Sequence, residues 1–175
     1  MDLKDVQKHW NAFGKIDPLW AILTFPDRKG NKWQRDEFFK TGLIEVNLVM
    51  KYVESLGQKI PCRKALDFGC GVGRLCSWLA SRCSEVYGID RGIEGLRLAA
   101  EYNARANIVY QAYDGETIPF SQSYFNAILC VGVLHKRVFP GEKLPRILGE
   151  FRRVLRTPGT IVAIEHVYGR EQASD

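Results

Sequence analysis

Two kinds of hydrophobic pattern divide the chain near residue 60. After this point, short apolar runs alternate with segments whose apolar residues recur every three to four positions, as on one face of a helix. The pattern predicts strands at residues 65–68, 85–90, 108–113, 127–131 and 160–167, and helices between them at 74–81, 95–106 and 144–155. Strands that alternate with helices predict a three-layer α/β fold with a mainly parallel sheet.

The first 60 residues predict a helical cap. Apolar residues have helical spacing in residues 2–13 and 36–56, and Gly57 follows the second segment as a C-terminal cap. Three of the four tryptophans lie here, together with several phenylalanines. We therefore expect a cap at residues 1–60 and an α/β ligand-binding domain at residues 61–175.

Composition narrows the class of protein. The chain has 175 residues, of which 46% are hydrophobic, so it can bury a sizeable core and is too apolar to be disordered. No apolar run reaches the roughly 18–20 residues of a membrane span. The N-terminus is charged and lacks the pattern of a signal peptide. These features predict a cytoplasmic protein without a membrane span.

The cysteines and histidines predict neither a disulfide framework nor a metal site. The five cysteines are an odd number, and no two of them have the C-x-x-C spacing of a zinc or redox site. The three histidines lie far apart in the chain. We expect no bound metal, and free, mostly buried thiols at Cys62, Cys70, Cys76, Cys83 and Cys130.

A glycine-rich loop, Asp67-Phe-Gly-Cys-Gly-Val-Gly73, follows the first predicted strand and leads into a helix. Alternate glycines let the backbone approach a ligand closely, and open α/β sheets bind ligands at the carboxyl ends of their strands. The G-x-G-x-G spacing differs from the G-x-G-x-x-G of dinucleotide sites, because Arg74 stands where the third glycine would be. The loop also lacks the Lys-Ser/Thr pair of a nucleoside triphosphate site. It therefore argues against both NAD and nucleoside triphosphates.

Carboxylates end the next two predicted strands. Asp90 could accept hydrogen bonds from a ribose diol, or it could cap the helix that follows. Asp114, followed by Gly115, could accept a hydrogen bond from the exocyclic amine of adenine, or the pair could form a simple Asp-Gly turn. The residues alone leave these alternatives open.

In this order the motifs resemble the class I S-adenosylmethionine-dependent methyltransferases, in particular the type 11 branch that resembles ubiquinone and menaquinone methyltransferases. The resemblance covers roughly residues 60–167 and rests on residues 65–74, 86–90, 114–120, 125–135 and 148–159. It implies a Rossmann-like fold, S-adenosylmethionine as cofactor and methyl transfer to a small-molecule acceptor.

The resemblance also implies a set of cofactor-binding residues by position. The residues that would hold the methionine end are those of the glycine loop: Asp67, Gly69, Cys70, Gly71 and Gly73. The residues that would contact the nucleoside are Asp90 at the ribose hydroxyls, Ile89 and Arg91 beside the adenine, and Asp114 and Gly115 at the adenine edge. Cys130 and Val131 would lie near the amino group and the methyl group.

Candidate residues for the acceptor come from the cap and from the end of the fourth strand. His135 is the candidate general base, needed only if the acceptor must lose a proton, with packing or capping of the next helix as the alternative. Trp33, Phe38 and Phe39 are the candidate pocket residues, because they lie beside the turn that must cross the site. The alternative is that these rings only pack the cap onto the sheet.

Several features depart from the family pattern. The family usually has aspartate and glycine where this chain has Asn126 and Thr160. Family members also continue past the fifth strand with a helix and a hairpin, for which a chain ending at Asp175 has no room. The fifth strand, residues 160–167, would then be an unpaired apolar edge, which is a template for association. We expect a homodimer that covers this edge, or a chain segment folded back over it.

Charge raises an alternative function. The net charge is +5, and residues 136–156 contain seven basic residues against two acidic ones. A methyltransferase that acts on nucleic acid is therefore one alternative. A charged helix face such as that of Arg146, Glu150 and Arg153 is usually only solvated, however, which argues against nucleic acid as the partner. A shortened, non-catalytic S-adenosylmethionine-binding module is another. We expect an enzyme that acts on a small molecule.

Overall fold

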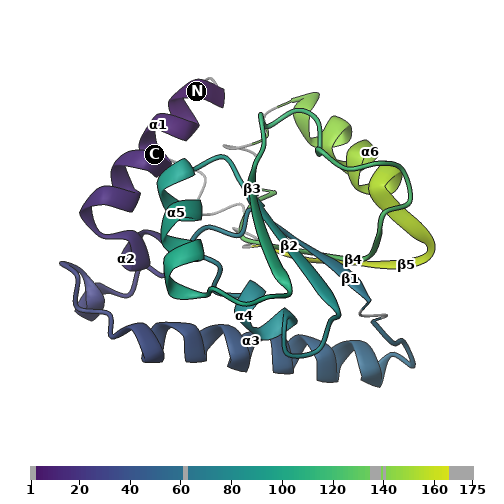
Figure 1. Ribbon diagram of the computed structural model, residues 1–175, viewed down its shortest axis with the longest axis horizontal. Coiled ribbons are helices and arrows are strands. Elements are labelled where there is room, and N and C mark those ends of the chain that lie inside the picture. Colours follow the sequence, from purple (N-terminus) through teal and green to yellow (C-terminus); the bar gives the residue numbers. More distant parts are fainter. Residues whose placement is uncertain (1–2, 61–62, 135–138, 140, 166–175) are drawn as a thin grey trace, which may run out of the picture.

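The computed structural model describes residues 3–60, 63–134, 139 and 141–165. Its centre is a five-stranded parallel sheet in the order β3-β2-β1-β4-β5. The strands are β1 (Lys64–Phe68), β2 (Glu85–Asp90), β3 (Ile108–Ala112), β4 (Phe125–Val131) and β5 (Leu155–Ile164). Because β1 lies in the middle, the loops that follow β1, β2 and β4 meet at one edge of the sheet (Figure 1).

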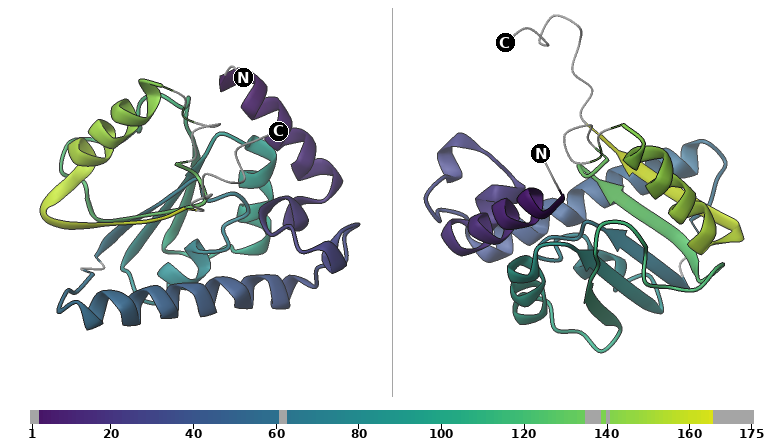
Figure 2. Two further views of the ribbon diagram at one scale, coloured as in Figure 1. Left: turned by 180° about the vertical axis from the view of Figure 1, so that it is seen from behind. Right: turned by 90° about the horizontal axis from the view of Figure 1, so that it is seen from above.

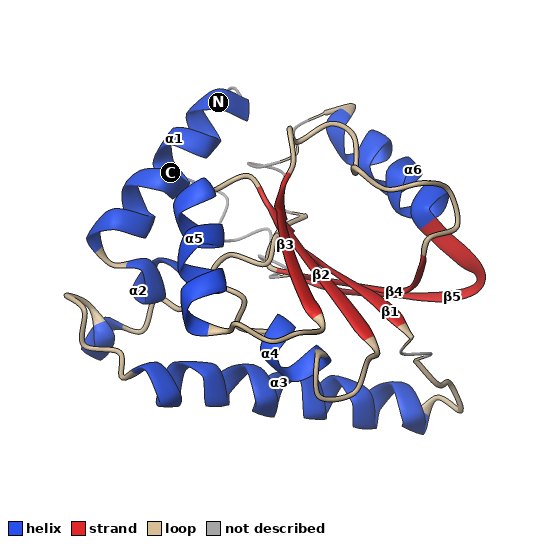
Figure 3. Ribbon diagram, in the orientation of Figure 1, coloured by secondary structure: helices blue, strands red, loops and turns tan. Residues whose placement is uncertain are grey.

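Helices cover both faces of the sheet, so the prediction of a three-layer α/β fold is confirmed (Figure 3). The helices on one face are α3 (Arg35–Ser55), α4 (Cys76–Leu79) and α5 (Ile93–Tyr102). Trp78 of α4 and Leu96 of α5 belong to the same buried cluster as Ala65 of β1. On the other face, Phe151 of α6 (Lys143–Val154) meets Phe68 of β1 edge to face, with ring centroids 4.8 Å apart. Alternate residues of β1 thus supply the cores of both faces.

The N-terminal segment forms α1 (Leu3–Ile16), α2 (Pro18–Ile22) and a short 3₁₀ helix (Pro26–Arg28) before α3 begins. Helix α1 lies against α5 (Figures 1 and 2). Gln7 Nε2 donates to the carbonyl oxygen of Arg91 at 2.9 Å, and the N–H of Glu94 donates to Asn11 Oδ1 at 3.3 Å. These two hydrogen bonds fix α1 over the end of β2.

Several elements differ in extent from their predictions: the helix predicted at residues 95–106, for example, is Ile93–Tyr102. The helix predicted at residues 74–81 shortens to Cys76–Leu79, because Gly73 has a φ of +77°, which no α-helix contains, and residues 71–75 form turns. Strand β5 begins at Leu155, directly after α6, and not at residue 160, because Leu155 already pairs with Phe125 of β4. The predicted end of this strand, residue 167, lies outside the described residues.

Cys70, Cys76 and Cys130 are free and buried, as predicted. The expectation of a free thiol is wrong for Cys83, which is disulfide-bonded. Spacing along the chain could not reveal this bond, because a disulfide depends on which Cα atoms the fold brings within about 7 Å. Cys62 lies outside the described residues. In the ranges that the structure describes, no helix has the length and hydropathy of a membrane span, and no cluster of His, Cys, Asp or Glu side chains could hold a metal.

Candidate functional site

A cavity of about 240 Å³ lies at the carboxyl ends of β1, β2 and β4, beneath the first two helices. Its walls are residues 69–72 after β1, residues 90–92 at the end of β2 and residues 131–133 at the end of β4. Trp10 of α1 and Ile22 of α2 line it from the side of the cap. Open parallel sheets bind their ligands at this place.

The loop after β1 turns sharply because its glycines adopt positive φ angles, +76° at Gly69, +54° at Gly71 and +77° at Gly73. Glycine alone takes this left-handed conformation without strain. The N–H of Gly69 donates to the carbonyl oxygen of Ile89 at 2.8 Å, which fixes the loop to the end of β2. Packing also requires glycine here, because a Cβ at Gly69 would overlap the side chain of Val133.

Asp90 connects the glycine loop to the start of α5. Its Oδ2 accepts a hydrogen bond from the N–H of Gly71 at 3.0 Å, and its Oδ1 accepts one from the N–H of Gly92 at 2.7 Å. Burial raises the pKa of Asp90 above its ordinary value, while these two backbone hydrogen bonds act to lower it. A carboxylate oxygen has two lone pairs, so each oxygen of Asp90 can accept a further donor from the cavity.

Asp67 lies deeper, at the end of β1, and only 2% of it is exposed. Its Oδ2 accepts a hydrogen bond from the thiol of Cys76 at 3.0 Å. Burial raises the pKa of Asp67 to about 6, and the hydrogen bond from Cys76 and the positive charge of Arg74 act in the opposite direction. Arg74 is itself buried and forms an ion pair with Glu45 of α3, with 2.6 Å between Nη2 and Oε2. Both Arg74 and Glu45 line the cavity, so this pair fastens the glycine loop to the cap.

Comparison with known proteins assigns the family. Residues 66–163, more than half of the chain, match the sequence model of a methyltransferase domain. The chain belongs to the class I S-adenosylmethionine-dependent methyltransferases. The family identified from the sequence motifs is therefore confirmed, and S-adenosylmethionine is its cofactor.

Individual relatives of this methyltransferase agree with the assignment. A protein named ubiquinone biosynthesis O-methyltransferase, from Psychrobacter cryohalolentis, is 32% identical over 138 residues, which cover 68% of this chain and 53% of the relative. The chain thus spans about half the length of this relative. Among solved structures, the PH0226 protein from Pyrococcus horikoshii is 26% identical, with a TM-score of 0.62 over 79% of this chain and 62% of that one.

A second solved structure shares the fold alone. It is phosphoethanolamine N-methyltransferase 1 of Haemonchus contortus, in complex with phosphoethanolamine and S-adenosylhomocysteine. Its TM-score is 0.73, its sequence identity is 15%, and the match covers 93% of this chain and 32% of that one. The sheet and the helices on its two faces are therefore those of a Rossmann-like methyltransferase.

The described residues of this methyltransferase fit the cofactor. At Gly71 a Cβ would stand 2.8 Å from Cδ1 of Ile22, at the side of the cavity where the loop must stay thin. Beside it, Asp90 keeps lone pairs for hydroxyl donors. We expect the cavity-lining members of the predicted set to hold S-adenosylmethionine; they are Gly69, Cys70, Gly71, Asp90, Arg91 and Val131.

Other predicted cofactor residues lie behind the cavity wall and do not line it. Ile89 and Cys130 are fully buried below the wall, and Asp67 is hydrogen-bonded to Cys76. Gly73 packs against Tyr110 and Asn103. These residues can act on the cofactor only through the backbone or through their neighbours, and their predicted roles stay predictions.

Asp114 forms the turn that the sequence offered as an alternative to adenine binding. Its Oδ1 accepts hydrogen bonds from the N–H groups of Glu116 and Thr117, at 2.8 and 2.9 Å. These backbone hydrogen bonds lower the pKa of Asp114. Gly115 lies against the side chain of Arg91, since a Cβ there would stand 2.7 Å from its Nε. Arg91 lines the cavity and Asp114 does not, so the segment touches the site through Arg91.

None of the predicted acceptor-pocket rings lines the cavity. Trp33 and Phe38 belong to a buried cluster with Val72 and Leu98, and Phe39 packs against it. Phe38 is fully buried. These rings pack the cap onto the glycine loop and α5, and not directly onto the sheet as the alternative interpretation had it. The candidate base, His135, lies outside the described residues.

Sequence reasoning missed several cavity residues. Trp10, Ile22, Val133 and Phe139 all line the cavity, and none of them is among the predicted site residues. The one available signal was position, because Val133 stands two residues after the end of the predicted fourth strand, in the loop where a ligand site is expected. Nothing in the periodicity of α1 or α2 indicates which of their side chains face the cavity.

Proposed function

We propose that the chain transfers a methyl group from S-adenosylmethionine to a hydroxyl oxygen of a small, largely apolar acceptor. The observation that carries this proposal is the position of Asp90, which shares one cavity with the glycine loop and accepts the N–H of Gly71. Relatives named as O-methyltransferases of ubiquinone biosynthesis support an oxygen acceptor. These relatives are longer than this chain, so the acceptor is part of the proposal.

When bound, S-adenosylmethionine supplies a methyl group on a positively charged sulfur, whose C–S bond breaks as the acceptor oxygen forms the new C–O bond, leaving S-adenosylhomocysteine. The residues of this chain contribute position and the exclusion of water. Asp90 would hold hydroxyl groups of the cofactor, and the glycine loop would let the cofactor lie close to the backbone. Trp10, Ile22 and Phe139 would keep water out of the cavity that they line.

The acceptor hydroxyl must lose its proton. Two carboxylates line the described part of the cavity, and both are engaged: Asp90 accepts backbone N–H groups and Glu45 is paired with Arg74. His135 remains our candidate for the proton acceptor. If it has this role, His135→Asn should lower the transfer rate most strongly at a pH where a histidine is neutral.

An acceptor screen tests the proposed function. The purified chain is incubated with S-adenosylmethionine and with phenols, catechols, a primary amine and a thiol, and S-adenosylhomocysteine is quantified. We expect turnover with a hydroxyl acceptor. Turnover with the amine or the thiol alone would contradict the oxygen acceptor, and cofactor binding without turnover on any compound would favour the non-catalytic module.

Two further proposals concern assembly and location. Strand β5 has one hydrogen-bonded neighbour in the described sheet, β4, and Ile161 on it is 41% exposed. We propose that a second copy of the chain covers this edge, and light scattering that gives the mass of a monomer would contradict it. A cytoplasmic location also remains a proposal.

A further inference from the structure

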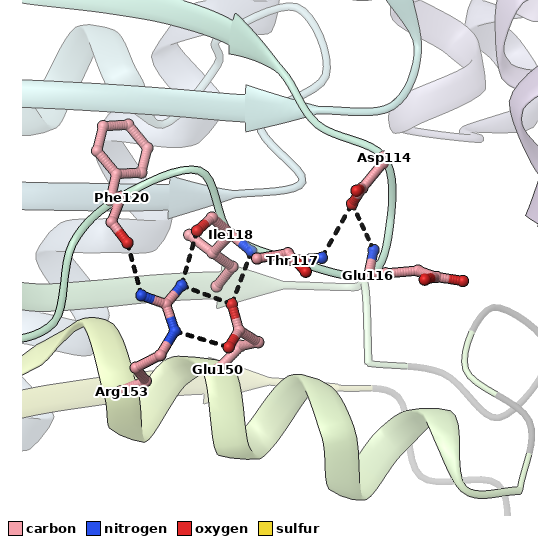
Figure 4. A network of polar contacts seen from close by, with 7 residues as sticks. All are labelled: Asp114, Glu116, Thr117, Ile118, Phe120, Glu150 and Arg153. Atoms are coloured by element: carbon pink, nitrogen blue, oxygen red, sulfur yellow. Dashed lines mark hydrogen bonds and ion pairs between the residues drawn. The ribbon is translucent and has the colours of Figure 1, made fainter.

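Helix α6 holds the segment between β3 and β4 through two side chains, Glu150 and Arg153 (Figure 4). Arg153 Nη1 donates to the carbonyl oxygen of Phe120 at 2.6 Å, and Nη2 donates to that of Ile118 at 2.8 Å. Glu150 Oε2 accepts the N–H of Ile118 at 2.8 Å. One helical turn of α6 therefore binds three backbone groups of this segment.

Glu150 and Arg153 also bind each other, which orients both side chains toward the segment. Arg153 Nε donates to Glu150 Oε1 at 2.7 Å and Nη2 donates to Oε2 at 2.6 Å, so the guanidinium and the carboxylate meet as two forks. The side chains are only 33% and 18% exposed. The hydrogen bonds of Arg153 lower the pKa of Glu150, which keeps the carboxylate charged. The expectation that both residues belong to a merely solvated face is therefore wrong, because the carbonyl groups that Arg153 binds come from a distant segment.

Asp114 holds the same segment from its other end. It accepts the N–H groups of Glu116 and Thr117, and Glu150 accepts the next one along the chain, that of Ile118 (Figure 4). Three successive N–H groups thus point at two carboxylates. A turn fixed in this way has little freedom to shift.

The fixed segment supports the wall of the cavity by two routes. The side chain of Ile118 is fully buried in a cluster that also contains Tyr113 and Phe139, both of which line the cavity. Gly115 lies against the side chain of Arg91, which lines the cavity as well. A displacement of the segment would therefore move Tyr113 and Arg91.

We propose that Glu150 and Arg153 are positioning residues for the cofactor site, and that they set the affinity for the cofactor by fixing residues 114–120. This inference rests on the proposed function, since it requires that the cavity binds S-adenosylmethionine. Neither residue lines the cavity. Because they order residues 114–120 before the cofactor binds, the entropic cost of ordering this segment does not reduce the binding free energy.

The test compares Arg153→Ala with Arg152→Ala, which removes a neighbouring exposed arginine from the same helix. Calorimetry with S-adenosylhomocysteine should show about tenfold weaker binding for Arg153→Ala and unchanged binding for Arg152→Ala. Amide hydrogen exchange should accelerate at residues 116–118 of Arg153→Ala and stay unchanged at residues 69–72. Arg153→Lys, which keeps a charged donor, should recover part of the affinity.

Equal affinity of Arg153→Ala and the unmodified chain, with both proteins folded, would overturn the inference and leave the proposed function intact. If Arg153→Ala does not fold, Glu150→Gln replaces it, and unchanged affinity in that variant would have the same meaning. Loss of stability without a change in affinity would assign the pair a structural role only. If the unmodified chain fails to bind S-adenosylhomocysteine, the proposed function falls and this inference falls with it.

Discussion

The carboxylate of Asp67 accepts a hydrogen bond from the thiol of Cys76, with 3.0 Å between Oδ2 and Sγ, in a buried position at the end of β1. Burial raises the pKa of Asp67 to about 6. An aspartate of the unfolded chain titrates near pH ~3.9, so the folded protein binds this proton more tightly. The contribution of the protonated Asp67 carboxyl to the stability of the fold is fully present below about pH 4 and is lost as the pH rises through about 6.

Asp67→Asn should therefore stabilise the chain at neutral pH. The buried charge disappears, and the amide oxygen can still accept the thiol of Cys76. We expect the free energy of unfolding at pH 7 to rise by about 2–3 kcal/mol, and its decline between pH 4 and 6 to flatten. Urea unfolding at several pH values measures both, with Asp36→Asn, an exposed site in α3, as the control. A steeper decline in Asp67→Asn would contradict the buried-charge explanation.

Asp90→Ala should weaken cofactor binding. Two hydrogen bonds to cofactor hydroxyls would be lost, which corresponds to about tenfold to a few hundredfold in the dissociation constant of S-adenosylhomocysteine. The variant should also lose some stability, because the N–H groups of Gly71 and Gly92 lose their acceptor. Calorimetry at a temperature where the variant is folded separates the two effects. An unchanged dissociation constant would mean that Asp90 only orders the glycine loop and the turn before α5.

Gly69→Ala should be more destabilising than Gly57→Ala. Both glycines have positive φ, +76° and +71°, so both substitutions carry the backbone strain of about 1–2 kcal/mol. A Cβ at Gly57 meets nothing within 4 Å, whereas one at Gly69 overlaps Val133. Urea unfolding measures the difference, and Gly69→Ala combined with Val133→Ala should recover part of it. Equal losses in the two single variants would show that the Val133 contact is unimportant.

Substitutions of Trp10 and Phe38 should affect ligand affinity and folding stability to different extents. Phe38 is fully buried and does not line the cavity, so Phe38→Ala should cost about 3–5 kcal/mol of unfolding free energy and change cofactor affinity less than Trp10→Ala does in the folded protein. Trp10 lines the cavity and is 41% exposed, so Trp10→Ala should change ligand affinity at little cost in stability. The opposite result would favour the predicted acceptor pocket of Trp33, Phe38 and Phe39.

The sheet and the glycine loop could be predicted because their signals are local. Positive φ at Gly69 and Gly71 follows from the alternate glycines, and Asp90 follows from the end of an apolar run. The strand order then predicts that these loops meet, because parallel strands bring their carboxyl ends to one edge of the sheet.

The contents of the cavity could not be predicted in the same way. Which aromatic ring of the cap faces the ligand depends on how α1 and α3 pack, and the sequence pattern is the same for Trp10, which lines the cavity, as for Phe38, which does not. The contacts of Arg153 depend on backbone carbonyl groups 33 and 35 positions away in the chain, which no periodicity indicates.

The most direct measurement is isothermal calorimetry of the purified chain with S-adenosylhomocysteine and, separately, with NAD. Asp90 beside a G-x-G-x-G loop predicts saturable binding of S-adenosylhomocysteine and a much weaker interaction, or none, with NAD. Tighter binding of NAD, or the absence of any heat with S-adenosylhomocysteine, would contradict the assignment of this cavity to the methyltransferase cofactor.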